Sequence, residues 1–132
     1  MRRIGQRTKN WLIFVREGFG NTKLVKDTRG RLYAQVGFGT PIPIKKDGGQ
    51  ITTNIYYPGY ATLAAEVISS VNQVCWKWEY AANSFALTVW TCDSNWNWQS
   101  SSAHFGLFTP EAYAAEVNFK QDLNGDGKIG TP

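Results

Sequence analysis

Short apolar runs separated by turn-forming residues follow one another along the first half of the chain. Residues 11–15 form a continuous apolar run of strand length. Residues 23–26 and 31–36 flank a turn-forming stretch and predict a hairpin. The two prolines within residues 41–44 restrict that segment to an edge strand or an extended loop. The pattern predicts a mainly β domain, built as a small antiparallel sheet, a meander or a sandwich.

The second half contains the clearest strand signal. Between residues 74 and 92, apolar and polar side chains alternate with a period of two on both sides of the small polar stretch 81–84. Two antiparallel strands joined by a tight turn explain this pattern. Residues 60–71 are ambiguous, because the stretch 63–68 fits either a helical turn or a strand.

The register of this hairpin decides where the two cysteines lie. If Asn83 and Ser84 form a two-residue loop, Cys75 lies directly opposite Cys92 in a non-hydrogen-bonded pair. Cα atoms in such a pair are about 4.5 Å apart, near the short end of the range for a disulfide. The sequence therefore suggests a cross-strand disulfide, and two half-buried thiols are the alternative. The same register places Trp90 on the face away from Trp76.

One helix is predicted near the C-terminus, at about residues 110–119. Thr109 is a good N-cap, and Pro110 occupies the first helical position, where its missing N–H costs nothing. Phe108 before the cap can pack on Tyr113, which shares a helix face with Val117 at i, i+4 spacing.

The helix leads into the strongest motif of the chain, an acidic loop at residues 122–130. The pattern D-x-N-x-D-G places Asp122, Asn124 and Asp126 at positions 1, 3 and 5 of an EF-hand-like or dockerin-like calcium loop. Gly127 at position 6 allows the sharp turn, and the carbonyl of Lys128 supplies position 7. Oxygen ligands clustered in this way suit Ca²⁺, and a plain turn rich in Asp and Asn is the alternative.

The predicted calcium loop lacks one usual ligand. Position 12, usually a bidentate Glu, would fall after Pro132. We therefore expect weak affinity, on the order of 10⁻⁴–10⁻³ M, as in extracellular modules. Ile129 at position 8 is expected to anchor the loop in the core.

Composition and charge narrow the class of protein. The chain has 132 residues, of which 14% are aromatic, so we expect one tryptophan-rich β domain at residues 11–132 after a basic leader at 1–10. Residues 1–50 carry a net charge of +8 and residues 51–132 a net charge of −4. The basic half can attract polyanions, but solvated lysines near turns explain it better, so nucleic acid is not an expected partner. No segment reaches the roughly 20 apolar residues of a membrane span.

The sequence offers no catalytic motif and one ambiguous group of aromatic residues. His104 is the only histidine, and it lies in a serine-rich stretch, so we expect no enzyme. Trp90, Trp96 and Trp98 alternate with amide and hydroxyl residues, as in sugar-binding faces, but indoles also form the core of domains that are poor in Leu and Ile.

The chain resembles the tryptophan-rich C-terminal domain family of cyanobacterial proteins. The matching segments are Gly20–Asp27, Leu32–Gly37, Pro43–Ile44, Gln50–Asn54, Leu63–Glu66, Val71–Val74, Val89–Thr91, Asp93–Trp96 and Asp122–Gly127. They are spread along the chain, and the resemblance extends over about residues 14–130. Aliphatic residues are expected in this family at the positions of Cys75 and Cys92, so their joint replacement favours the disulfide.

The resemblance implies a module found at the ends of large surface or secreted proteins, or repeated within them, with no established enzymatic activity. It also implies that Asp122, Asn124 and Asp126 are calcium ligands. The expected function is thus a calcium-stabilised, extracellular or cell-surface module for adhesion or assembly, with surface proteins, matrix proteins or glycans as partners. The alternatives are a module that binds glycans or polyanions through exposed tryptophans and the basic half, and a C-terminal secretion or anchoring element.

Overall fold

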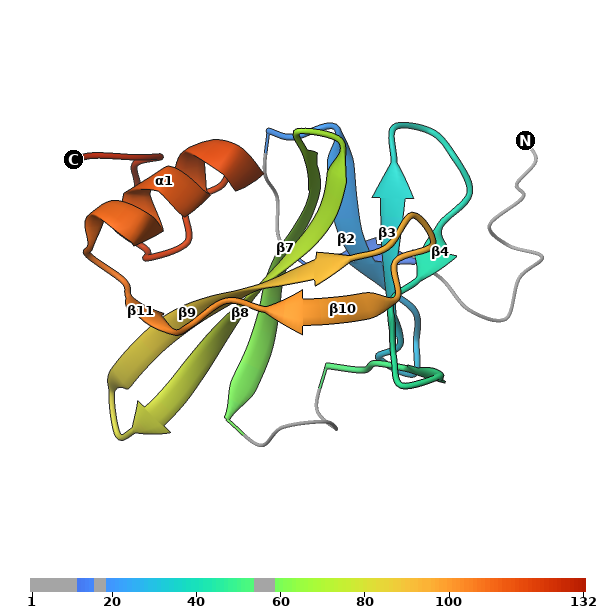
Figure 1. Ribbon diagram of the computed structural model, residues 1–132, viewed down its shortest axis with the longest axis horizontal. Helices are drawn as coiled ribbons and strands as arrows, with labels where there is room; N and C mark the ends of the chain where they lie inside the picture. The colour runs from blue at the N-terminus through green and yellow to red at the C-terminus, as the bar shows by residue number, and fades with distance from the viewer. Residues whose placement is uncertain (1–11, 16–18, 54–58) are drawn as a thin grey trace.

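The computed structural model describes residues 12–15, 19–53 and 59–132, and these form two larger antiparallel sheets, one two-stranded sheet and one helix (Figure 1). The expected mainly β fold is therefore confirmed. The proposed basic leader at residues 1–10 lies outside the described residues.

The N-terminal sheet has the strand order β1-β2-β3-β4. Its strands are β1 (Ile13–Phe14), β2 (Thr22–Lys26), β3 (Leu32–Val36) and β4 (Ile42–Pro43). The predicted hairpin is present, because β2 pairs with β3 along its whole length. The segment with two prolines forms the short edge strand β4, as its missing donors require.

A buried aspartate holds the turn between β2 and β3. The carboxylate of Asp27 accepts hydrogen bonds from the backbone N–H groups of Arg29 (2.9 Å) and Arg31 (3.0 Å), from Nε of Arg31 (2.7 Å) and from the hydroxyl of Tyr33 (3.0 Å). Burial alone would raise the pKa of Asp27, but these hydrogen bonds outweigh it and lower the pKa below its ordinary value. The ionised side chain therefore fixes the hairpin.

The larger sheet has five strands in the order β10-β9-β8-β7, with β11 also paired to β9. Its strands are β7 (Tyr60–Ile68), β8 (Val71–Ala81), β9 (Ser84–Cys92), β10 (Trp98–Ser101) and β11 (Phe105–Gly106). The ambiguous stretch at residues 60–71 is thus mostly strand. In the chain, β5 (Lys45–Lys46) and β6 (Gly49–Gln50) come after β4 and before β7, and they pair with each other as a short two-stranded sheet.

The β8–β9 hairpin is present, but its predicted register is wrong by three residues. The turn consists of Ala82 and Asn83, and Asn83 adopts the left-handed conformation (φ 59°) that asparagine tolerates well. A bulge between Glu79 and Ala81 shifts the pairing further. Trp76 consequently pairs with Thr88. A register shift by an odd number of residues places the side chains of β9 on the opposite face relative to those of β8. Trp90 therefore lies on the same face as Trp76, and Cys92 lies on the opposite face from Cys75.

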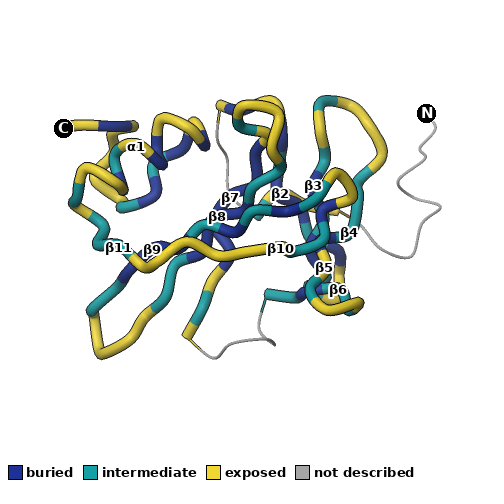
Figure 2. The backbone as a smooth tube through the Cα atoms, viewed as in Figure 1, coloured by how far each residue is buried: buried dark blue, intermediate teal, exposed yellow. Residues whose placement is uncertain are grey.

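The five-stranded sheet separates two hydrophobic cores. Buried residues, dark blue in Figure 2, recur along its central strands and along α1. One core lies between the two sheets and contains Val74, Trp76, Trp90 and Trp96 together with residues of β2 and β3. The other lies between the sheet and the C-terminal helix. Its buried members are Leu63, Ala64, Cys75, Leu87, Ala112, Ala115, Phe119 and Leu123.

The helix α1 (Pro110–Phe119) has the predicted bounds and cap. Oγ1 of Thr109 accepts a hydrogen bond from the backbone N–H of Ala112 at 3.3 Å. The face that Tyr113 and Val117 share is not the buried one, since Val117 is 56% exposed, and Phe108 before the cap is 61% exposed. The buried residues are instead Ala112, Ala115, Glu116 and Phe119. This stripe includes a carboxylate, and that carboxylate is central to the acidic loop.

Candidate functional site

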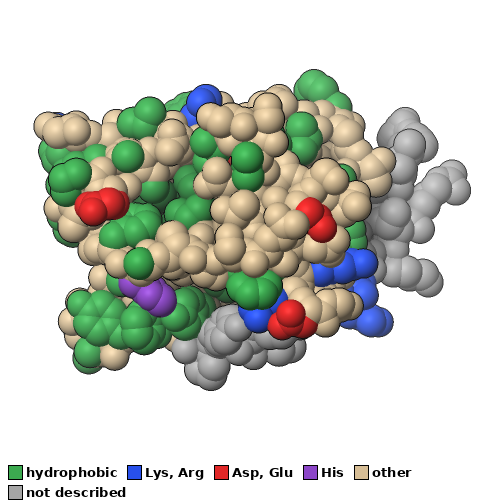
Figure 3. Space-filling view, in the orientation of Figure 1, with side chains coloured by type: hydrophobic (Ala, Val, Ile, Leu, Met, Phe, Trp, Pro, Cys, Tyr) green, Lys and Arg blue, Asp and Glu red, His purple; other side chains and the backbone are tan. Residues whose placement is uncertain are grey.

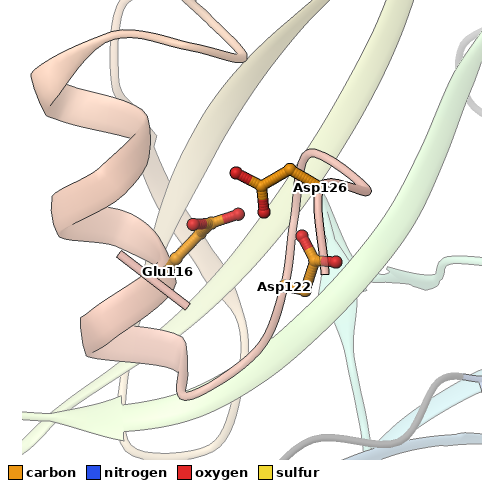
Figure 4. Close-up of side chains that lie close together, drawn as sticks. All are labelled: Glu116, Asp122 and Asp126. Atoms are coloured by element: carbon orange, nitrogen blue, oxygen red, sulfur yellow. The ribbon is translucent and has the colours of Figure 1, made fainter. Parts of the chain in front are cut away.

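Three carboxylates converge between α1 and the loop that follows it (Figure 4). Glu116 comes from the helix, and Asp122 and Asp126 come from the loop. One oxygen from each of the three lies within 4.8 Å of the other two. The sequence predicted the two aspartates as neighbours, whereas Glu116 was not among the expected ligands.

Glu116 is fully buried and ties the loop to the helix. Its Oε2 accepts hydrogen bonds from the backbone N–H groups of Leu123 (2.8 Å) and Asn124 (3.1 Å), and its Oε1 accepts one from Gly130 (2.9 Å). Three backbone donors thus compensate for the burial of one carboxylate. The sequence signal for this role is the position of Glu116 four residues after Ala112, which places a carboxylate within a helix stripe of small and apolar residues.

The loop is folded around Asp122. Its two carboxylate oxygens accept hydrogen bonds from the backbone N–H groups of Gly125 and Gly127, each at 2.8 Å. Burial alone would raise the pKa of Asp122, but these donors outweigh it and hold the pKa below its ordinary value. Gly127 has φ +83°, so the expected sharp turn at loop position 6 is present.

The remaining predicted ligands also lie in this loop. Oδ1 of Asn124 accepts a hydrogen bond from the backbone N–H of Asp126 (3.1 Å), and Oδ1 of Asp126 accepts one from Lys128 (2.9 Å). The expected anchor is wrong: Ile129 is 38% exposed, whereas Leu123 at loop position 2 is 1% exposed. A buried leucine and a buried glutamate therefore fix the loop.

Clustered oxygens of this kind can hold a hard cation. A carboxylate oxygen has two lone pairs, so an oxygen that accepts one N–H can still face a metal ion. Asp126 is exposed, which leaves one side of the cluster open to solvent. The residues present fit Ca²⁺ in ligand type, because the donors are carboxylate and amide oxygens.

The three candidate ligand-binding tryptophans do not form an exposed face. Trp90 is 4% exposed and Trp96 is 1% exposed, and both belong to the core between the sheets. The prediction that Trp90 points away from Trp76 is wrong, because their ring centroids are 4.8 Å apart. Trp98 is half-buried, and its ring centroid lies 6.3 Å from that of Trp90. The wrong register accounts for the misplacement of Trp90.

The predicted disulfide is also wrong. Cys75 pairs with Val89 and faces the helix, whereas Cys92 pairs with Asn72 and lies in the core between the sheets. The two thiols lie on opposite faces of the sheet, and both are buried. Burial, with a smaller contribution from the charge of Asp93, raises the pKa of the Cys92 thiol to about 12.

We expect both thiols to be unreactive in the folded protein. Burial restricts access to both, and the raised pKa of Cys92 keeps it protonated at neutral pH. A chromogenic disulfide reagent should titrate almost no thiol at pH 8 under native conditions and two thiols in denaturant. Mass spectrometry after incubation under oxidising conditions should still show two reduced cysteines. Protection of both as an intramolecular disulfide would contradict the observed register.

The fold and the acidic loop define a small tryptophan-rich β domain that ends in a helix and an acidic turn. The family model described as the tryptophan-rich Synechocystis species C-terminal domain matches residues 22–130, and the chain belongs to this family. Comparison with curated proteins and with solved structures gave no significant match. Among the described residues, no helix has the length and apolar character needed to cross a membrane.

Proposed function

We propose that this domain is a non-catalytic, calcium-stabilised module of a cell-surface or secreted protein that serves adhesion or assembly. The observation that carries the proposal is the convergence of Glu116 of α1 with Asp122 and Asp126 of a loop that has the D-x-N-x-D-G pattern. Membership of a C-terminal domain family supports a role as one module of a larger protein.

Calcium would act on the fold through charge. Asp122 and Asp126 each offer a carboxylate oxygen within 4.8 Å of the other, close enough for mutual repulsion when both are ionised. A divalent cation between them would remove this repulsion and hold the loop against α1. Because the same loop is bonded to the helix through Glu116, metal binding is coupled to the stability of the domain.

The test is a thermal melt followed by tryptophan fluorescence in 10 mM Ca²⁺ and in excess chelator. With a dissociation constant of about 10⁻⁴–10⁻³ M, Ca²⁺ should add about 1.4–2.7 kcal/mol to the free energy of unfolding. For a domain of this size, the melting temperature should rise by several degrees. Mg²⁺ at the same concentration should give a smaller rise, because it requires near-ideal octahedral geometry.

Two matched variants separate a specific site from a general salt effect. Asp126→Asn removes one charge from the cluster but keeps an oxygen that can accept the N–H of Lys128, so it should fold and lose most of the Ca²⁺ effect. Glu111→Gln changes an exposed carboxylate in the first turn of the same helix and should keep the full effect. Equal melting temperatures with and without Ca²⁺ in the unmodified protein would refute the calcium proposal.

A further inference from the structure

Aromatic side chains form a continuous row across one face of the five-stranded sheet. Neighbouring rings along it have centroids 4.8–6.4 Å apart. In order from β10 to the hairpin end of β8, the row is Trp98, Trp90, Trp76, Tyr60, Trp78 and Tyr80. Figure 3 shows hydrophobic side chains gathered at the lower end of this face, next to the histidine in purple.

A cavity of about 250 Å³ opens in the middle of this row. Trp76, Trp90, Trp98 and Tyr60 supply its aromatic lining. Its polar lining comes from Lys46, Thr88, Ser101, Ser102 and His104. Sites for drug-sized ligands measure roughly 300–1,000 Å³, so this cavity suits a smaller molecule of about one ring.

Trp76, one of the residues that line the cavity, carries an uncompensated donor. Nε1 of Trp76 is buried and has no hydrogen-bond acceptor among the residues that the structure describes. Trp76 itself is only 2% exposed. An unpaired buried N–H is costly, and most buried donors in folded proteins find a partner. An acceptor oxygen on a bound molecule would satisfy this indole.

The character of the lining narrows the class of ligand. Among the described residues that line the cavity there is no Asp or Glu, so they offer no carboxylate that would form an ion pair with a cationic ligand. Nζ of Lys46 lies 4.3 Å from the centroid of the Trp98 ring and forms a salt bridge with Asp47. The hydroxyl of Tyr60 is hydrogen-bonded to Nε2 of His104 at 3.0 Å. The lining therefore combines flat apolar faces with hydroxyl and N–H groups.

We propose that this cavity binds one hexopyranose unit, as a free sugar or at the end of a glycan. A pyranose has C–H faces that pack on aromatic rings and a rim of hydroxyl oxygens that both donate and accept hydrogen bonds. Trp98 and Trp90 provide the apolar wall, and Nε1 of Trp76 donates to a sugar oxygen. Ser101 also lines the cavity; its hydroxyl accepts Nε1–H of Trp98 at 2.9 Å and keeps its own proton to donate to a sugar oxygen. The hydroxyl of Ser102 is already bonded, because it donates to the carbonyl of Ala103 and accepts from the N–H of Val89, each at 2.9 Å.

This site differs from the tryptophan face expected from the sequence. Of the three tryptophans predicted to bind a ligand, Trp90 and Trp98 line the cavity and Trp96 does not. Tyr60, Trp76 and His104 were not among the predicted ligand-binding residues. The proposal is independent of calcium, because no cavity residue belongs to the acidic loop. The acidic loop suggests how the module is stabilised, whereas the cavity suggests a ligand that the module binds.

The test is a titration with methyl glycosides of glucose, galactose, mannose and N-acetylglucosamine, and with methyl glucuronide as the acidic member. Tryptophan fluorescence and saturation-transfer NMR report binding at the indoles. At least one sugar should saturate the signal with a dissociation constant on the order of millimolar, as expected for a ligand of this size. Benzyl alcohol serves as a probe with an aromatic ring and a single hydroxyl, and glycerol as a probe with hydroxyls and no ring.

Three variants identify the site. Trp98→Ala removes one wall and should weaken binding at least tenfold, and Trp76→Phe keeps a ring without the N–H and should weaken it by about the same factor. Tyr80→Ala is the matched control, because Tyr80 belongs to the aromatic row, is 56% exposed and does not line the cavity. It should bind within twofold of the unmodified protein. Near-UV circular dichroism establishes that each variant is folded.

Several outcomes would overturn the proposal. These are saturation by none of the sugars, tighter binding of benzyl alcohol than of any sugar, or unchanged binding in Trp98→Ala. If Trp76→Phe does not fold, Trp98→Ala and Tyr80→Ala still decide the question, since Trp98 is half-buried and Tyr80 is exposed. Because the titration can be run in chelator, a negative result here leaves the calcium proposal to its own melting experiment.

Discussion

Replacement of Glu116 by alanine is expected to lower the free energy of unfolding by about 3–5 kcal/mol, as for other broken buried charge networks. The carboxylate is fully buried and accepts three backbone hydrogen bonds, from Leu123, Asn124 and Gly130. Alanine would leave these donors without their acceptor and would detach the loop from the helix. Urea denaturation, followed by tryptophan fluorescence, measures the loss.

Two further variants show that the effect belongs to this carboxylate. Glu116→Gln keeps one acceptor oxygen but presents an amide N–H₂ group to a backbone donor, so it should lose at least half as much stability as Glu116→Ala. Glu111→Ala, at an exposed position in the same helix, should change stability by less than about 1 kcal/mol. A loss below about 1 kcal/mol in Glu116→Ala would mean that solvent replaces the three hydrogen bonds.

Replacement of Trp96 by alanine is expected to cost a comparable amount, about 3–5 kcal/mol. The indole is 1% exposed and is the largest of the fully buried side chains in the described structure. Its backbone also connects the parts of the fold, since the Trp96 carbonyl accepts the N–H of Lys45 (3.1 Å) and its own N–H donates to Asp93 (3.0 Å). Urea denaturation measures the loss of packing against both sheets.

Trp98→Ala is the matched control for this second prediction. Trp98 lies two residues away and is half-buried, so its removal should cost about 1–2 kcal/mol. The difference between the two variants separates a tryptophan that holds the core from one that lines a cavity. Equal losses in the two variants would contradict the assignment of Trp96 to the core.

Local signals explain why much of the fold could be predicted from the sequence. The turn between β2 and β3 and the cap at Thr109 depend on residues close in sequence, and both have the predicted positions. The β8–β9 register depends on one bulge and on the position of Asn83 as the second residue of the turn. The alternation of apolar and polar side chains does not determine either feature. That single error also caused the wrong disulfide and the wrong face for Trp90.

The candidate site was predictable only where its residues are consecutive. The loop pattern from Asp122 to Asp126 is visible in the sequence, whereas Glu116 approaches it only because the helix reverses into the loop. The sugar cavity is built from β5, β7, β8, β9 and β10 and the segment after β10. No pattern along the chain indicates that Tyr60 and His104 meet, although their polar atoms are 3.0 Å apart.

Because the five-stranded sheet has a separate core on each face, the residues of the two faces can vary independently. Along β8, Cys75 faces the core under the helix, whereas Val74 and Trp76 face the core between the sheets. Substitutions on opposite faces share few neighbours, so their effects on stability should be close to additive. Compensating changes should then occur within one face only. The cavity and the acidic loop can therefore diverge separately in relatives that keep the same sheet.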